Sequence, residues 1–419
     1  MSSASASSST TAPHDRDPAP PPPPATVPVA ALAALAFAAF ALCSAEFALV
    51  GLLLDVSRDL RVPVATAGQL LSAYALVVAV GGPVVTALTA RVAPRTLAAA
   101  LLAVFAAANV LGAIAPSFPL LMAARTLGAL THSTFAAVCV LIAVRMSPPG
   151  RQGTAIAWVS GGLGLATVLG GPVGTAVGQQ WGWRATFWCV TAAAAVALTA
   201  LVTLVPRSVT RGPAGARTAG ARVLARPQVI CALGVTAVSQ AGWFLLYSYV
   251  APLLRDTTGY GATATTVLLF LFGLGGFAGN AVGGRYADRS LRGTLVVSLT
   301  VLAGALALVS AVAEAKAAVP VAILLIGAAS GALVPPLQSW VLGAAGGGSA
   351  LAVAANTSAF NLGNAAGSWG GSRLLANGAD VTALGWTGAV VVAAALAGAA
   401  MALRRRPRRD AAAGPGVRR

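Results

Sequence analysis

Long apolar segments, separated by short polar connections, make up most of the chain. A helix needs about 20 apolar residues to cross a bilayer, and such windows occur twelve times. They cover roughly residues 29–54, 67–88, 97–115, 120–144, 154–177 and 185–205, then roughly 229–254, 264–282, 294–313, 319–341, 350–375 and 381–403. The pattern predicts an all-α polytopic membrane protein with 12 transmembrane helices in two six-helix halves.

The polar segments divide the chain further. Residues 1–28 are mostly Ser, Ala, Thr and Pro, which predicts a disordered cytoplasmic tail without the basic start of a secretory signal. A basic cytoplasmic linker, 206–228, separates the six-helix bundles 29–205 and 229–403. A basic cytoplasmic tail, 404–419, follows the last helix.

Charge supports this topology. Only 9% of the residues are charged, against about 25% in soluble proteins. The formal net charge of +17 raises the alternative of nucleic-acid binding, but the basic residues cluster at the ends of the spans. With the N-terminus inside, nineteen basic residues fall on cytoplasmic segments and six on outer loops, as the positive-inside rule requires. We therefore expect a protein of the inner (cytoplasmic) membrane, with both termini cytoplasmic and no nucleic-acid partner.

Residues 161–188 form an apolar stretch with an unusual number of glycines. Gly170, Gly174 and Gly178 lie four apart, so they share one helix face and let a neighbouring backbone approach closely. Pro172 cannot donate to the carbonyl of Val168, which predicts a bend just after Gly171.

The same stretch resembles a known motif. Gly162, Gly171, Pro172 and Gly174, closed by the sequences GQ at 178 and GWR at 182, resemble the fifth-helix antiporter motif of the major facilitator superfamily. More narrowly, the chain resembles the twelve-helix drug:proton antiporters of that superfamily, over residues 29 to 403. The resemblance implies the major facilitator fold, in which two six-helix halves rock around a midplane site.

Glu46 is the one acidic residue well inside an apolar span. A buried carboxyl is costly when ionised, so Glu46 can load and release a proton if it faces a wet cavity or a partner. The alternative is a protonated structural glutamate. The sequence around Glu46 and Phe47 resembles the first-helix signature of the drug exporters, with Ala45 where those proteins usually carry Ser or Thr.

Arg125 and His132 are further candidates for proton coupling. Arg125 resembles the buried arginine of the superfamily's fourth-helix motif, although an arginine near the interface can also snorkel. His132 follows two helical turns later and is the only histidine in a span. Histidine can change charge at physiological pH, and a structural histidine bonded across helices is the alternative.

Two loops resemble the cytoplasmic gating motif of the superfamily. After the eighth span the chain reads GRYADRSLR, and the corresponding loop in the first half has Ala90 at the acidic position. The candidate gating residues are Arg91, Arg95, Gly284, Asp288, Arg289 and Arg292. Asp288 can pair with an arginine or a helix N-terminus and close the cytoplasmic side.

Polar and aromatic positions in other spans are candidates for a substrate cavity. They are Tyr74, Tyr247, Tyr249 and Asn361. Interhelical hydrogen bonds explain such residues almost as well. A mostly apolar cavity with one carboxylate favours apolar, amphiphilic cargo.

Several kinds of chemistry are not expected. The four cysteines lack CxxC spacing and are predicted to be small core residues, not disulfides or metal ligands. A P-loop needs Gly-Lys-Ser/Thr, but the single lysine, Lys316, follows Ala315. We expect no enzymatic activity, catalytic residue, metal or cofactor, and no use of ATP.

These observations predict a monomeric, proton-driven antiporter in the lipid bilayer that exports small, largely apolar drugs. The resemblance is to bacterial chloramphenicol-resistance and multidrug permeases, and to arabinose-efflux-like permeases, so chloramphenicol or a related antibiotic is the expected cargo. Export of a sugar or of an endogenous metabolite is an alternative. A non-transporting membrane sensor is a second alternative.

Overall fold

The computed structural model describes residues 29–89, 91–148, 152–206, 223–346 and 350–404. The expected tails, 1–28 and 405–419, and most of the expected linker lie outside these residues. The first half contains α1 (Val29–Ala48), η1 (Leu49–Leu52), α2 (Leu53–Asp59), α3 (Val64–Leu88), α4 (Pro94–Ala113), α5 (Phe118–Met146), α6 (Gln152–Trp181) and α7 (Trp183–Leu204). The second half contains α8 (Pro227–Tyr247), α9 (Val250–Pro252), η4 (Leu253–Thr257), α10 (Ala262–Ala287), α11 (Leu291–Ala311), α12 (Val319–Ala345), α13 (Ala350–Ala376) and α14 (Val381–Arg404).

The expected all-α polytopic class is confirmed. Ten helices of the described chain are long and apolar enough to cross a membrane, and α6 makes an eleventh if its two arms count as one span. The helix that falls short is α13, which carries the amides Asn356, Asn361 and Asn364. The count is compatible with the expected twelve spans.

The bend in α6 lies earlier than the sequence predicts. The arms Trp158–Ala166 and Val168–Trp181 are inclined by 41°, so the bend is about one turn before Gly171. Pro172 leaves the carbonyl of Val168 without its helical donor. The helix bends near this carbonyl and not after Gly171, so the predicted position of the bend is wrong by about one turn.

The glycine face of α6 packs against α1 and η1, as the sequence predicts. A Cβ added at Gly162 would collide with the backbone of Ala36. One added at Gly170, Gly174 or Gly178 would collide in turn with Ser44, Ala48 and Leu52. The helices therefore touch backbone to backbone, which is how helices associate where lipid supplies no hydrophobic drive.

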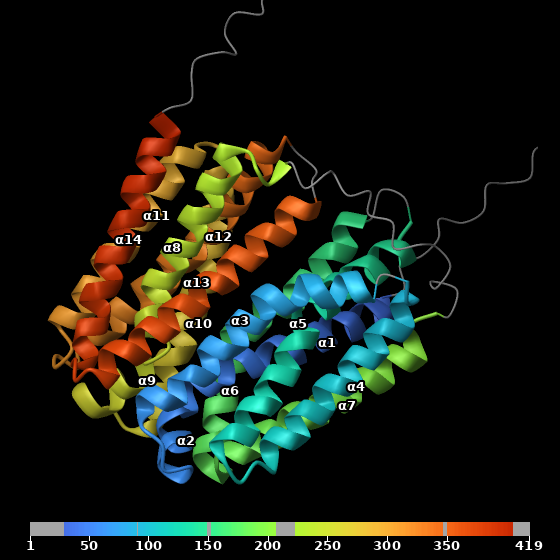
Figure 1. Cartoon of the computed structure of the whole chain (residues 1–419), viewed down its shortest axis with the longest axis horizontal. Coiled ribbons are helices and arrows are strands. Elements are labelled where there is room, and N and C mark those ends of the chain that lie inside the picture. Colours follow the sequence, from blue (N-terminus) through green and yellow to red (C-terminus); the bar gives the residue numbers. More distant parts are fainter. Residues whose placement is uncertain (1–28, 90, 149–151, 207–222, 347–349, 405–419) are drawn as a thin grey trace, which may run out of the picture.

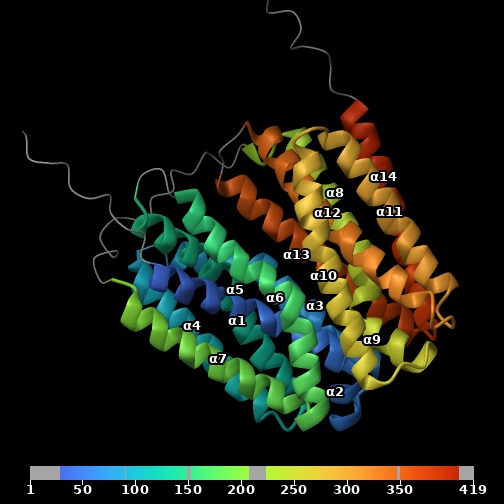
Figure 2. The same ribbon diagram turned by 180° about the vertical axis from the view of Figure 1, so that it is seen from behind.

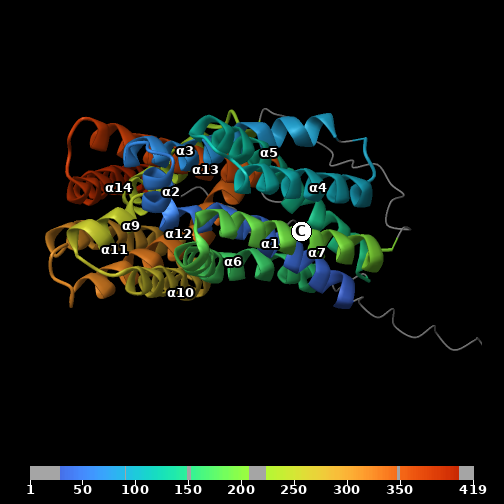
Figure 3. The same ribbon diagram turned by 90° about the horizontal axis from the view of Figure 1, so that it is seen from below.

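The helices form two bundles, α1–α7 and α8–α14, which lie side by side (Figures 1 and 3). They meet around α2 and α9 and diverge toward the end where α1 begins and α14 ends (Figures 1 and 2). Several hydrogen bonds and one ion pair between described residues of the two bundles lie at the end away from these termini. They join Asp55 to Arg255 (3.3 Å), Ser368 to the carbonyl of Gly68 (3.1 Å), Ser372 to the carbonyl of Ala65 (2.7 Å) and Thr266 to Gln179 (3.0 Å).

The first span of each bundle is broken at a corresponding place. After Ala48 the chain tightens into the 3₁₀ segment η1 before α2 begins. In the second bundle α8 ends at Tyr247, and α9 and the π-helical η4 follow. Such 3₁₀ and π segments within a long helix often mark functional hinges, and both lie where the bundles meet.

Candidate functional site

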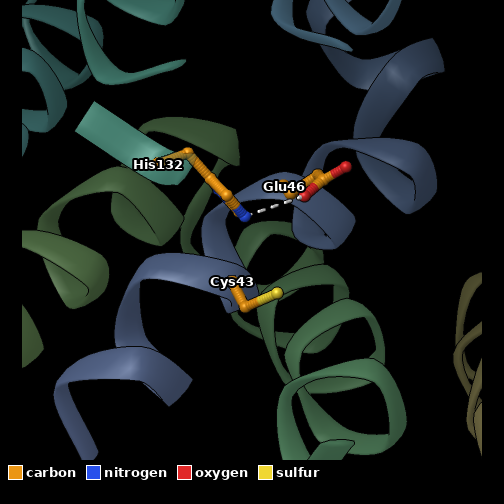
Figure 4. Close-up of side chains that lie close together, drawn as sticks. All are labelled: Cys43, Glu46 and His132. Atoms are coloured by element: carbon orange, nitrogen blue, oxygen red, sulfur yellow. Dashed lines mark ion pairs between the residues drawn. The ribbon is translucent and has the colours of Figure 1, made fainter. Parts of the chain in front are cut away.

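Glu46 lies on α1, just before the break at η1, and His132 of α5 approaches it (Figure 4). Glu46 Oε2 is 3.8 Å from His132 Nε2, and the two side chains are 14% and 13% exposed. The structure therefore brings together two of the three residues expected to couple protons. The carboxylate is largely buried and has a titratable neighbour within 4 Å.

Tyr74 of α3 connects the remaining groups. Its hydroxyl is 3.0 Å from His132 Nδ1, and its ring meets the imidazole edge-on, with centroids 5.9 Å apart. The guanidinium carbon of Arg125 lies 4.2 Å from the centre of the same ring. Tyr74, expected to line a substrate cavity, thus belongs to the cluster of Glu46, Arg125 and His132.

Arg125 is 4% exposed, so it does not snorkel to the interface. Its NH1 donates to the carbonyl of Ala45 at 2.8 Å, and its Nε and NH2 have no hydrogen-bond partner in the described chain. The guanidinium interacts electrostatically with Glu46. At Ala45, where the resembled signature has a hydroxyl, the backbone carbonyl accepts from Arg125.

The expected gating residues do not hold the bundles together in this arrangement. Asp288, the C-cap of α10, is exposed, and its carboxylate makes no ion pair or hydrogen bond within the described chain. The guanidinium carbon of Arg289 lies 5.7 Å from the ring centre of Tyr286. Arg95 donates to the carbonyl of Val202 on α7, inside its own bundle.

Three other gating positions complete this set. Arg91 and Arg292 are exposed. A Cβ added at Gly284 would lie 3.8 Å from Pro335 of α12, which is an ordinary van der Waals contact. The expected role of the gating residues in closing the cytoplasmic side stays a prediction.

The remaining cavity candidates occupy different environments. Tyr247 is buried in an aromatic cluster with Trp243, Phe244 and Phe272. Tyr249 is fully buried against Gly68 of the other bundle, and its hydroxyl donates to the carbonyl of Ser368. Asn361 donates to the carbonyl of Thr357 on its own helix at 3.0 Å.

Sequence reasoning missed the ion pair between the two bundles. Arg255 NH1 of η4 lies 3.3 Å from Asp55 Oδ1 of α2. A usable signal was present, because an acid and a base lie near the C-terminal ends of the first spans of the two halves. Asp59 is different, because it binds Arg184 and Trp183 of its own bundle.

Comparisons with known proteins agree with this architecture. The sequence model of the Major Facilitator Superfamily matches residues 35–368 and 233–419. The chain is 36% identical to the inner membrane transport protein YdhP of Escherichia coli (strain K12) over 379 residues, which is 90% of this chain and 96% of that protein. It is 35% identical to a chloramphenicol resistance protein of Streptomyces lividans over 372 residues, 86% and 93% of the two chains.

Solved structures share the fold at low sequence identity. A D-xylose-proton symporter has a TM-score of 0.70 at 16% identity, covering 88% of this chain and 96% of its own. A bacterial homologue of the human lysosomal transporter Spinster, inward-facing and unoccupied, has a TM-score of 0.68 at 17% identity, covering 90% and 95%. With an all-α polytopic bundle, a matching family model and relatives across most of its length, the chain belongs to the major facilitator superfamily of membrane transporters.

Proposed function

We propose that this transporter is a proton-coupled antiporter that exports small, largely apolar compounds, with chloramphenicol or a related antibiotic as cargo. The observation that carries the proposal is the position of Glu46. This carboxylate lies deep in a membrane-spanning helix, beside His132 and within the field of Arg125. A carboxylate in such a place is a functional group by default.

The proposed cycle uses the two bundles alternately. If both termini are cytoplasmic, the arrangement described above is closed toward the outside and diverges toward the cytoplasm. Glu46 takes up a proton when the bundles open outward and releases it when they open inward. Arg125 then supplies the positive charge that a buried carboxylate needs once its proton has left.

Cargo and proton would use the central region in turn, so that inward proton flow drives cargo outward. Each charge moved across a potential of 100 mV contributes about 2.3 kcal/mol. No ATP or other cofactor enters this cycle. The aromatic cluster around Tyr247 would receive the apolar part of the cargo.

The name of the Streptomyces lividans relative supports an antibiotic as cargo. Export of a sugar or an endogenous metabolite is the alternative. It would require polar contacts; Asn361 Nδ2 already donates to the backbone of its own helix, whereas Asn364 Oδ1 and Gln240 Nε2 are buried without a partner in the described chain. A non-transporting sensor fits less well, because the relatives at 36% identity are named as transport proteins.

The proposal is tested with acidified everted vesicles that carry the protein. Adding chloramphenicol, within a panel of drugs, is expected to trigger proton release, whereas vesicles without the protein should not respond. A wild-type protein that responds to no drug but does respond to sugars or cell metabolites would contradict the drug assignment.

The ion pair between Asp55 and Arg255 gives a second prediction. Asp55→Asn removes a contact between the bundles, so it should shift the balance toward the outward-open arrangement by about 1 kcal/mol, roughly fivefold in population. Spin labels on the outer ends of α3 and α13 would report a larger fraction of long distances.

Asp59→Asn is the matched control for this measurement. It breaks a pair of the same kind, between Asp59 and Arg184, that lies within one bundle. The distances between the labels should stay as in the wild type. An equal shift in both variants would show that the Asp55–Arg255 pair does not hold this end closed.

A further inference from the structure

Three side chains with different donor atoms lie close together near the end of α1, just before η1 (Figure 4). Cys43 and Glu46 are three residues apart and therefore share a face of α1, and His132 reaches them from α5. The thiol sulfur, a carboxylate oxygen and an imidazole nitrogen all lie within 4.8 Å of one another. No spacing along the chain marks this group, because the third donor comes from a different helix.

We infer that Cys43, Glu46 and His132 form a binding site for a thiophilic divalent metal ion of the Zn²⁺ or Cd²⁺ type. Sulfur, nitrogen and oxygen donors together are the ligand set that Zn²⁺ uses in proteins. Mg²⁺ and Ca²⁺ take oxygen ligands and have no use for the thiolate. The inference departs from the expectation, based on Cys spacing, that no cysteine is a metal ligand.

The geometry is close to what a metal ion requires. With bonds of about 2.0 to 2.3 Å, a tetrahedral ion holds its ligand atoms roughly 3.3 to 3.8 Å apart. The distance from Glu46 Oε2 to His132 Nε2 is already 3.8 Å. The sulfur lies within 4.8 Å of both other donor atoms, so it must approach by at most about 1 Å, and water would take the fourth position as in open zinc sites.

Tyr74 orients the histidine for this role. Metal-bound histidines almost always donate their other ring N–H to a fixed acceptor. The hydroxyl oxygen of Tyr74 lies 3.0 Å from His132 Nδ1 and can accept that hydrogen bond. The lone pair is then on Nε2, the nitrogen that faces Glu46.

The nearby cation sets a condition on binding. Arg125 interacts electrostatically with Glu46 and lies over Tyr74, so its charge opposes the entry of a second cation. A thiolate at Cys43 together with the Glu46 carboxylate supplies two negative charges, which neutralise a divalent ion. An ion that does not bind sulfur strongly should therefore fail to bind.

A bound ion would occupy the carboxylate that the proposed proton transfer needs. It would hold the transporter inactive until a chelator removed it. This consequence rests on the proposed function, whereas metal binding does not. Binding is therefore measured directly on the purified protein.

The probe is Cd²⁺, added to detergent-solubilised protein purified without a polyhistidine tag. The wild type is expected to bind one Cd²⁺ per chain, with the ultraviolet absorption of a cadmium–thiolate bond. Cys43→Ala should abolish this absorption and weaken Cd²⁺ binding by more than about 100-fold. Tyr74→Phe removes only a partner of a ligand, so it should weaken binding roughly 10- to 100-fold while the absorption remains.

Cys139→Ala is the matched control, because Cys139 is also buried in the first bundle, but no acid or histidine of the described chain is grouped with it. This variant should bind Cd²⁺ like the wild type, and Mg²⁺ should not displace the Cd²⁺. Cys43→Ala that still binds with thiolate absorption would overturn the inference, as would an equal loss in Cys139→Ala. Gel-filtration profiles identify any variant that has lost its fold, and Cys43→Ser then replaces Cys43→Ala.

Discussion

Glu46→Gln is expected to abolish drug-triggered proton release from everted vesicles, down to the level of vesicles without the protein. Glutamine keeps the size of the side chain and can donate a hydrogen bond near His132, as a protonated glutamate would. It cannot release a proton. The variant should therefore fold and reach the membrane, yet move no protons in exchange for cargo.

Glu314→Gln is the matched control, because Glu314 is exposed and follows the end of α11. The same chemical change at that position should leave proton release at the wild-type level. If Glu46→Gln releases protons as well as the wild type does, Glu46 is a structural glutamate and the proton pathway runs through another group. Equal losses in both variants would point to a general effect of removing acidic charge.

Gly162→Val is expected to destabilise the folded protein by about 3 kcal/mol. A Cβ at this position would lie 2.8 Å from the carbonyl carbon of Ala36 and 3.0 Å from its Cα. Backbone atoms cannot rotate away as a flexible side chain can, so α6 must separate from α1. The loss should appear as a lower temperature of unfolding in detergent, followed by gel filtration after heating.

The neighbouring residue provides the control. Gly161 is exposed, and a Cβ there would meet nothing within 4 Å. Gly161→Val adds the same side chain to the same helix one position away, and it should leave the unfolding temperature close to that of the wild type. Equal destabilisation by both variants would show that the cost comes from the helix itself and not from the contact with α1.

The contact between α6 and α1 also concerns the proposed transport site. Glu46 lies on α1, which packs against the glycine face of α6. Gly170 and Gly174 contact Ser44 and Ala48, which precede and follow Glu46 by two residues. A residue in the resembled antiporter motif can thus act by holding α1 in place. Its role in antiport stays a prediction.

The sequence by itself determined most of the membrane spans, the glycine face of α6 and the acidic residue that lies well inside a span. These features depend on composition and on spacing along one helix. A run of apolar residues must be buried in lipid wherever its neighbours lie, and glycines four apart share a face in any α-helix. Local patterns of this kind need no knowledge of the packing partner.

Only the tertiary structure decided which side chains meet. Tyr74, Arg125 and His132 come from α3 and α5, and their contacts with one another and with α1 depend on how each helix is rotated and how deeply it lies. The same holds for Asp55 with Arg255, 200 residues apart in sequence. The bend of α6 lies before the position that the sequence predicts, because Pro172 leaves a carbonyl one turn earlier without its hydrogen bond and the helix bends there. Contacts between helices arise from packing in three dimensions, which the order of residues along the chain does not reveal.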